Sequence, residues 1–134
     1  LVEVLQNSTV PMLGICLGMQ LMCSFSEEGN VEGLGIFNNR VELMNGGGNI
    51  KVPHVGWNTI TSLKSPLFEN VSEEDYVYYV HSFSANVNEN TIATTDYCKP
   101  FSGSLNKNNF FGCQFHPEKS GKVGELILSN FAKL

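Results

Sequence analysis

Three residues of this chain could together carry out nucleophilic chemistry. Cys16 stands between two glycines, in the segment Gly14-Ile-Cys-Leu-Gly18, where a short apolar run gives way to a helical pattern. Far along the chain, His116 stands two positions before Glu118. A thiol nucleophile, a base and a carboxylate that orients the base are the side chains that a thiol acyl-transfer enzyme requires. The sequence therefore predicts an enzyme that forms a thioester at Cys16.

The surroundings of Cys16 suit a nucleophile. Residues 10–15 predict a buried parallel strand and a helical pattern begins at Leu17, so Cys16 falls on the sharp strand-to-helix turn called a nucleophile elbow. We expect Gly14 and Gly18 to let strand and helix pack closely, and the helix N-terminus to lower the pKa of the thiol. The backbone N–H of Leu17 would point to where an oxyanion forms. The alternative is a buried, inert thiol in a glycine-flanked turn.

The histidine and glutamate are expected to touch. Residues two apart in an extended segment face the same side, and Pro117 favours an extended His116. A contact with Glu118 would fix the tautomer of His116 and leave its other nitrogen to take the proton of Cys16. The alternative is a surface histidine beside a glutamate. No carboxylate stands two residues after His54 or His81, so we interpret these competing bases as hydrogen-bonded structural or interface residues.

The elements that must position these residues are a mixture of strands and helices. A helix tail is expected at residues 1–5, and helices are predicted over residues 17–25 and 122–134. Loops and short strands are expected over residues 31–49, with a tight loop at the three glycines 46–48 that lacks the Lys-Ser/Thr of a phosphate loop. Strands are predicted over residues 10–15, 58–61, 76–80, 91–95, 101–105 and 110–115, the last two joined by a hairpin turn. This order predicts one domain with a three-layer α/β fold and a mixed sheet.

The composition narrows the class of protein. The chain has 134 residues, of which 42% are hydrophobic, enough for one domain with a packed core. Its net charge of −5 is spread along the chain, which argues against binding to nucleic acid or to an anionic membrane. The four cysteines form no C-x-x-C pair or zinc spacing, so we expect no metal, no cofactor and a cytoplasmic protein with free thiols. Cys23, Cys98 and Cys113 are expected to be small core residues.

The motifs resemble those of a known family. Pro11-Met-Leu-Gly-Ile-Cys-Leu-Gly-Met-Gln20 and Gln114-Phe-His-Pro-Glu118 resemble the two hallmark motifs of class I glutamine amidotransferases. Three further segments are similar to the glutaminase subunits of imidazole glycerol phosphate synthases, which serve histidine biosynthesis: Lys51-Val-Pro-His-Val-Gly-Trp-Asn58, Tyr78-Tyr-Val-His-Ser-Phe83 and His116-Pro-Glu-Lys-Ser-Gly121. The resemblance covers nearly the whole chain. It implies a flavodoxin-like class I amidotransferase fold, and a reaction in which Cys16 attacks the side-chain amide of glutamine and ammonia leaves.

The resemblance also implies which residues meet the substrate and the partner. Glutamine would be bound by Leu17, Gln20, Glu28, Ser82 and Phe83. Ammonia would pass to a cyclase subunit, a (β/α)8 barrel that makes imidazole glycerol phosphate and AICAR, across an interface at Trp57, Asn58, Tyr78 and Lys119. The alternative for Glu28 is a carboxylate at a solvated helix end. The alternative for Trp57 and Tyr78 is ordinary core packing, and the alternative for Lys119 is a surface lysine without a role.

The N-terminus departs from the family pattern. The chain begins with Leu1 rather than Met, and nothing in it matches the family's first strands or the Gly-rich loop that supplies the second oxyanion donor. We therefore expect an N-terminally incomplete glutaminase domain that folds poorly by itself, because the missing strands leave a sheet edge unpaired. We also expect it to be nearly inactive by itself, because the loss of one oxyanion donor costs roughly 10²–10³ in rate. Its full-length parent would be an enzyme.

Three other functions stay open at this point. One is a paralogous glutaminase that feeds a different amidating synthetase, for instance in surface sugar modification. The second is an inactive regulatory scaffold, and the third is a stand-alone thiol hydrolase of γ-glutamyl compounds.

Overall fold

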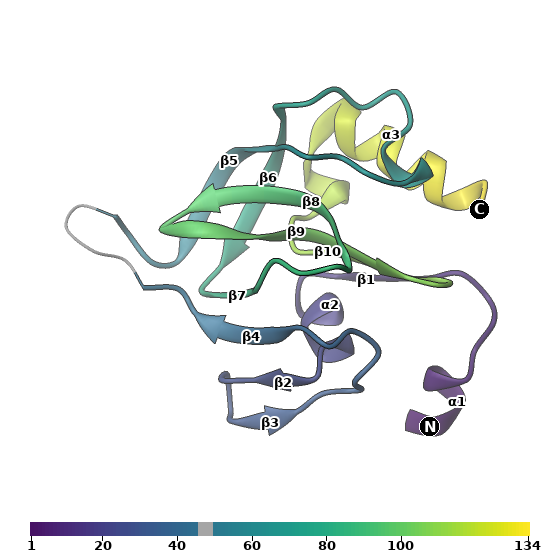
Figure 1. Ribbon diagram of the computed structural model, residues 1–134. Coiled ribbons are helices and arrows are strands. Elements are labelled where there is room, and N and C mark those ends of the chain that lie inside the picture. The colour runs from purple at the N-terminus through teal and green to yellow at the C-terminus, as the bar shows by residue number, and fades with distance from the viewer. Residues whose placement is uncertain (46–49) are drawn as a thin grey trace.

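The computed structural model describes residues 1–45 and 50–134, so the predicted glycine loop at 46–48 lies outside the described residues. Figure 1 shows the arrangement of the elements. The helices are α1 (Val2–Gln6), α2 (Leu17–Met22) and α3 (Gly121–Ala132), with 3-10 helices η1 (Pro66–Phe68) and η2 (Pro117–Lys119). The strands are β1 (Met12–Ile15), β2 (Phe25–Ser26), β3 (Val31–Glu32), β4 (Arg40–Leu43), β5 (His54–Ile60), β6 (Asp75–His81), β7 (Phe83–Ala85), β8 (Thr91–Tyr97), β9 (Lys99–Lys107) and β10 (Phe110–Cys113).

The central sheet has the strand order β1-β10-β9-β8. Strand β1 lies at one edge and runs parallel to β10, with Ile15 opposite Cys113, whereas β10, β9 and β8 are antiparallel neighbours. The sheet is therefore mixed, as the sequence predicts. Because β1 and β10 end at the same level, the residues that follow them leave the sheet side by side, which is where sites form in α/β folds.

The two faces of this sheet are covered by different helices. Side chains alternate along β10: Phe110 packs in a cluster with Met19 of α2, whereas Phe111 packs in the larger cluster with α3, its ring 5.9 Å from that of Phe131. Figure 1 shows α2 and α3 on opposite sides of the sheet. This arrangement of helix, sheet and helix confirms the predicted three-layer α/β fold.

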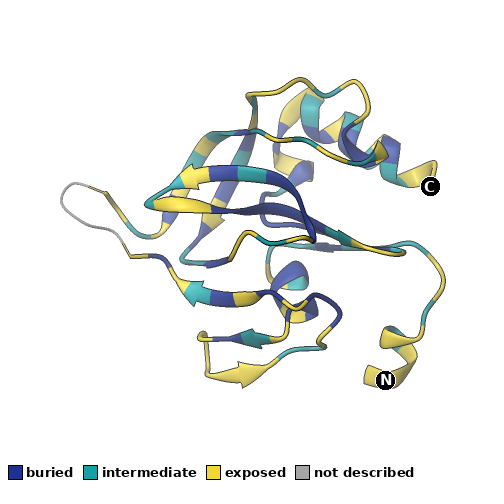
Figure 2. Cartoon of the chain, in the orientation of Figure 1, coloured by how far each residue is buried: buried dark blue, intermediate teal, exposed yellow. Residues whose placement is uncertain are grey.

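Strands β5 and β6 form a separate antiparallel ribbon, with Trp57 opposite Tyr78. One face of the ribbon adds Ile60, Val77 and Tyr79 to the core, and the other is exposed (Figure 2). A third sheet of order β3-β2-β4-β7 lies beside α2. Within the described residues, no helix is both long and apolar enough to span a membrane.

Candidate active site

Cys16 is the turn between β1 and α2. Its φ of 54° and ψ of −109° are a backbone conformation that residues other than glycine rarely adopt. The Cys16 N–H donates to the Cys113 carbonyl at 2.7 Å, which extends the ladder between β1 and β10, and its own carbonyl accepts from the N–H of Gln20 at 3.2 Å. One residue thus ends the strand and begins the helix, which is the predicted elbow.

The two glycines beside the elbow differ in how tightly they are packed. A Cβ on Gly14 would lie 2.7 Å from the carbonyl carbon and oxygen of Gly18, whereas a Cβ on Gly18 would meet nothing within 4 Å. The prediction that both glycines permit close packing is right for Gly14 and wrong for Gly18. Only Gly14 is needed to bring β1 against α2.

The pKa of the Cys16 thiol is raised above its ordinary value, because burial of the sulfur outweighs every other influence. The backbone N–H of Leu17 lowers this pKa, the carboxylates of Glu118 and Glu28 raise it, and the side-chain amide of Gln114 lowers it. The expectation that the helix N-terminus gives a net lowering is therefore wrong. The thiol is protonated at neutral pH and depends on a base.

His116 and Glu118 are in contact, as predicted. The Nδ1 atom of His116 lies 2.8 Å from a carboxylate oxygen of Glu118, which leaves Nε2 for the thiol. His116 is extended, with φ −98° and ψ 99°, but η2 follows it, so a turn and not a continuous extended segment brings the carboxylate back. The buried hydroxyl of Ser120 donates to the His116 carbonyl at 2.6 Å and accepts from the Tyr78 N–H at 2.9 Å, which holds this turn in place.

Strand β6 contacts both Cys16 and His116. The N–H of His116 donates to the Tyr78 carbonyl at 2.9 Å, and the Cys16 sulfur lies 3.8 Å from the Val80 carbonyl. Carbonyls two residues apart face the same edge of a strand and lie about 6.7 Å apart. In the part of the chain that the structure describes, no hydrogen bond joins Cys16 to His116. Catalytic hydrogen bonds are often long before substrate binds and tighten afterwards.

A pocket of about 200 Å³ opens at the sulfur. Its walls come from the elbow and α2 on one side and from the junction of β6 and β7 on the other, and they comprise Cys16, Leu17, Gln20, Glu28, Val80, His81, Ser82 and Phe83. All five residues that the sequence nominates for substrate binding lie in this one pocket with the nucleophile.

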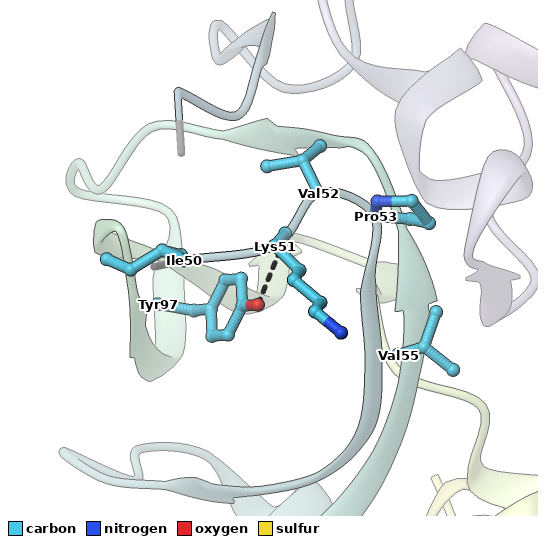
Figure 3. A pocket seen from close by; sticks show the side chains of 6 residues that line it. All are labelled: Ile50, Lys51, Val52, Pro53, Val55 and Tyr97. Carbon is cyan, nitrogen blue, oxygen red and sulfur yellow. Dashed lines mark hydrogen bonds between the residues drawn. The ribbon is translucent and has the colours of Figure 1, made fainter. Parts of the chain in front are cut away.

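A larger hollow of about 750 Å³ lies away from these residues, along the segment that leads into β5 (Figure 3). It is lined by Ile50, Lys51, Val52, Pro53, Val55 and Tyr97, and the Tyr97 hydroxyl donates to the Lys51 carbonyl at 2.5 Å. No thiol, imidazole or carboxylate is among these lining residues, so this hollow lacks the groups that the sequence nominates for catalysis. Among the described residues there is also no cluster of three His, Cys, Asp or Glu side chains that could hold a metal ion.

Comparison with known proteins identifies the family. Residues 1–134 match the family model for glutamine amidotransferase class-I. The chain belongs to the class I glutamine amidotransferases. The imidazole glycerol phosphate synthase subunit HisH of Bacteroides fragilis is 57% identical over 125 residues, which cover 92% of this chain and 64% of that protein. The HisH subunit of Bacteroides thetaiotaomicron is 53% identical over 133 residues, which cover 98% of this chain and 68% of that protein.

Solved structures agree with the fold of this amidotransferase. A putative GMP synthase protein from Thermoplasma acidophilum superposes with a TM-score of 0.71 at 20% identity, covering 98% of this chain and 60% of that one. The glutaminase domain of Trypanosoma brucei CTPS, with bound acivicin, gives a TM-score of 0.61 at 15% identity and covers 98% and 64% of the two chains. At these identities the likeness concerns the fold alone. The amidotransferase chain spans 64% of the length of its B. fragilis relative.

Two buried amides lie behind Cys16, and the sequence predicts a role for only one of them, Gln20. Gln114 is fully buried, and its Nε2 lies 3.6 Å from the Cys16 sulfur. Gln20 donates from its Nε2 to the Gln114 Oε1 at 2.9 Å and to the Phe83 carbonyl at 3.1 Å. Both hydrogens of the Gln20 amide are thus used inside the protein, and only its Oε1 is left for a substrate. The parallel register of β1 and β10, which sets Gln114 beside Cys16, is the signal that would have found it.

His54 and His81 form a buried pair, which confirms that they are hydrogen-bonded structural residues. Their Nδ1 and Nε2 atoms lie 3.0 Å apart, and His81 Nδ1 lies 2.9 Å from the Phe83 carbonyl. The ring of His54 also stacks on that of Tyr97, with centroids 3.9 Å apart. Burial lowers the pKa of each histidine to about 4, and for His54 the charge of His81 adds to the effect.

Acidification is expected to destabilise the amidotransferase through this pair. The unfolded histidines take up protons near pH 6.5 and the folded ones only near pH 4. The contribution of the neutral pair to the free energy of unfolding is therefore fully present above pH 6.5 and is lost as the pH falls toward 4. The loss is on the order of 3 kcal/mol for one histidine. Urea unfolding between pH 7 and pH 4 measures it, and His81→Phe should flatten the slope. Gln20→Met, which removes no titrating group, should lower stability at every pH with the slope kept; equal slopes for all three proteins would contradict this origin.

The four residues nominated for the partner interface do not share one face of the amidotransferase. Trp57 is 54% exposed and its ring meets that of Tyr78 edge to face at 5.8 Å, while the exposed Lys119 follows in η2. Asn58 points the other way. Its Nδ2 lies 3.3 Å from His54 Nε2 and 3.3 Å from the Asp96 carbonyl. Neighbouring residues on a strand face opposite sides, so the Asn58 side chain does not lie on the exposed face that carries Trp57 and Tyr78.

Proposed function

We propose that this protein hydrolyses glutamine to glutamate and ammonia through a thioester at Cys16. The observation that carries the proposal is the position of the Cys16 sulfur, which lies on a strained elbow and in a pocket. The same strand, β6, contacts both this sulfur and a histidine that a carboxylate already orients. Because the thiol is protonated at neutral pH, His116 acts as general base through Nε2, and Glu118 stabilises the imidazolium that forms.

The bond changes follow from these positions. The thiolate attacks the amide carbon of glutamine, and the backbone N–H of Leu17 donates to the developing oxyanion. Collapse of this intermediate breaks the C–N bond, and His116 returns its proton to the leaving ammonia. A water molecule, deprotonated by His116, then attacks the thioester, which releases glutamate and restores the thiol.

The α-amino end of glutamine would meet Glu28. This carboxylate lines the pocket, and its charge reaches the Cys16 thiol, so it lies within range of a bound substrate. A carboxylate facing the substrate ammonium is a charge-assisted contact of the strong kind. Gln20 would contribute only its Oε1, and Ser82 and Phe83 would form the opposite wall.

The ammonia would pass to the cyclase subunit of imidazole glycerol phosphate synthase, in the synthesis of histidine. The names of the relatives, each a subunit of that synthase, support this partner. The exposed face of the β5–β6 ribbon suits a protein partner, because paired residues present one apolar, aromatic surface beside His116: Val55, Trp57, Tyr76, Tyr78 and Val80. Four cysteines without a disulfide fit the reducing cytoplasm.

Ammonia release tests the function. The full-length protein is incubated with glutamine, first by itself and then together with the ligand-loaded cyclase. Strong stimulation by the loaded cyclase is the expected result. If the cyclase does not change the rate of glutamine hydrolysis, the protein is a paralogous glutaminase that supplies another acceptor. If no glutamine is hydrolysed with or without the cyclase, the protein is an inactive scaffold.

A further inference from the structure

A chain of hydrogen bonds leads from the β5 strand inward to the pocket. Asn58 Nδ2 lies 3.3 Å from His54 Nε2, His54 Nδ1 lies 3.0 Å from His81 Nε2, and His81 Nδ1 lies 2.9 Å from the Phe83 carbonyl. All three contacts lie on the inner face of the ribbon, where both histidines are almost wholly covered, with exposures of 3% and 6%.

The series of hydrogen bonds continues from the Phe83 carbonyl to the Cys16 sulfur. Gln20 Nε2 donates to this carbonyl at 3.1 Å and to Gln114 Oε1 at 2.9 Å. Gln114 Nε2 lies 3.6 Å from the Cys16 sulfur. Gln20 is 6% exposed and Gln114 is fully buried, and within the described residues no buried side-chain nitrogen or oxygen lacks a partner.

The backbone fixes both histidine tautomers. A carbonyl oxygen only accepts, so the Nδ1 of His81 carries the proton and its Nε2 accepts. His54 must then donate from Nδ1 and accept at Nε2, which requires the NH2 group of Asn58. This amide orientation is confirmed at its other end, because Asn58 Oδ1 accepts from the Thr59 N–H at 2.7 Å. Burial keeps both rings neutral near pH 7, as this pattern requires.

The same carbonyl fixes the two glutamine amides. Gln20 must present its NH2 group to the Phe83 carbonyl, and its second hydrogen then meets Gln114 through Oε1. Gln114 is left with its NH2 group toward the sulfur. If Gln114 were flipped, its Oε1 would face the sulfur and oppose the thiolate charge.

We propose that His81, supported by His54, is a positioning residue for Cys16: by holding the Phe83 carbonyl it keeps Gln20 and Gln114 in the one orientation that donates a hydrogen bond to the thiolate. The inference deepens the proposed function and rests on it for its catalytic meaning. The two histidines touch no reacting atom. They act through the two amides. Among the described residues, the only acceptors of these amide donors are the Phe83 carbonyl, the Gln114 Oε1 and the Cys16 sulfur, so loss of one contact leaves a buried donor unsatisfied.

Alkylation of Cys16 by iodoacetamide measures the thiolate directly. The rate at Cys16, followed by peptide mass spectrometry in the full-length protein, is recorded from pH 7 to pH 12 for the parent and three variants. Gln114→Met removes the donor, His81→Phe removes the support of the Phe83 carbonyl, and His81→Asn restores a donor at the position of Nδ1. The first two should shift the midpoint upward and slow alkylation at pH 7 about tenfold, and His81→Asn should recover most of the rate.

The double variant separates positioning from general damage. His81→Phe should shift the midpoint in the parent but add no shift in the Gln114→Met background, because its effect passes through that amide. A shift of the alkylation midpoint of equal size in both backgrounds would overturn the proposal. It would also be overturned if His81→Asn lowered the alkylation rate as much as His81→Phe does. An unchanged midpoint in folded Gln114→Met, judged by thermal unfolding, would also overturn it.

The readout does not depend on glutamine hydrolysis. If the midpoints shift as expected while no ammonia is released from glutamine, the proposed function fails and the positioning of the thiol stands. If ammonia is released but the midpoints do not shift, the positioning inference fails alone.

Discussion

Replacement of Cys16 with alanine is expected to lower glutamine-dependent ammonia release by about 10⁴- to 10⁶-fold, because no other group in the pocket can form the thioester. The effect concerns chemistry and not folding: the side chain is small and alanine adopts the same backbone with the same strain. Steady-state ammonia release by the full-length protein with the proposed cyclase partner measures the loss. Cys98→Ala, outside the pocket, should keep the parent rate.

Two further results decide whether this loss is chemical. External ammonium should restore product formation by the complex that contains Cys16→Ala, since only the supply of ammonia is missing. Cys16→Gly should be as inactive as Cys16→Ala but more stable by about 1 kcal/mol, because glycine tolerates a φ of 54° without strain. Glutaminase activity that survives in Cys16→Ala would remove the thioester mechanism.

The parts of the site that the sequence predicts are those that depend on local spacing. The contact of His116 with Glu118 involves residues two apart, and the elbow at Cys16 lies where an apolar strand pattern meets a helical one. Both can be predicted without knowledge of the tertiary fold, and the structure confirms both.

The parts that the sequence does not predict depend on pairing between distant segments. The strand predicted from residue 58 begins at His54, because pairing with β6 overrides the weak strand preference of this glycine-containing segment. The helix after Cys16 ends at Met22 and not at residue 25, since Phe25 pairs with β3 and β4. These pairings create the inner face where His54 meets His81.

The sequence predicts the wrong direction for the pKa of Cys16 for a related reason. A pattern of residues shows that Cys16 precedes a helix, and a helix N-terminus favours a thiolate. It does not show how far the sulfur is buried or which carboxylates approach it, and these two influences set the direction of its pKa. The same limit applies to Gly14 and Gly18, which look alike in the sequence and differ entirely in what surrounds them.

Gly14→Ala is expected to destabilise the protein by about 3 kcal/mol and to lower glutaminase activity about 100-fold. Its Cβ would lie 2.7 Å from the Gly18 carbonyl group and 2.8 Å from the Met19 nitrogen. These are backbone atoms that no rotamer change can remove, so β1 and α2 must separate. The separation displaces Cys16, and a shift of about 1 Å at a reacting group costs about 100-fold in rate.

Gly18→Ala is the matched control, because it adds the same methyl group on the other side of the elbow, in α2. Nothing lies within 4 Å of its Cβ, and alanine favours a helix over glycine by up to about 1 kcal/mol. This variant should therefore be at least as stable as the parent in urea unfolding and should keep its activity. If the two alanine variants lose stability equally, the close contact of β1 with α2 does not hold the elbow; if Gly14→Ala alone unfolds early and loses ammonia release, that contact positions the nucleophile.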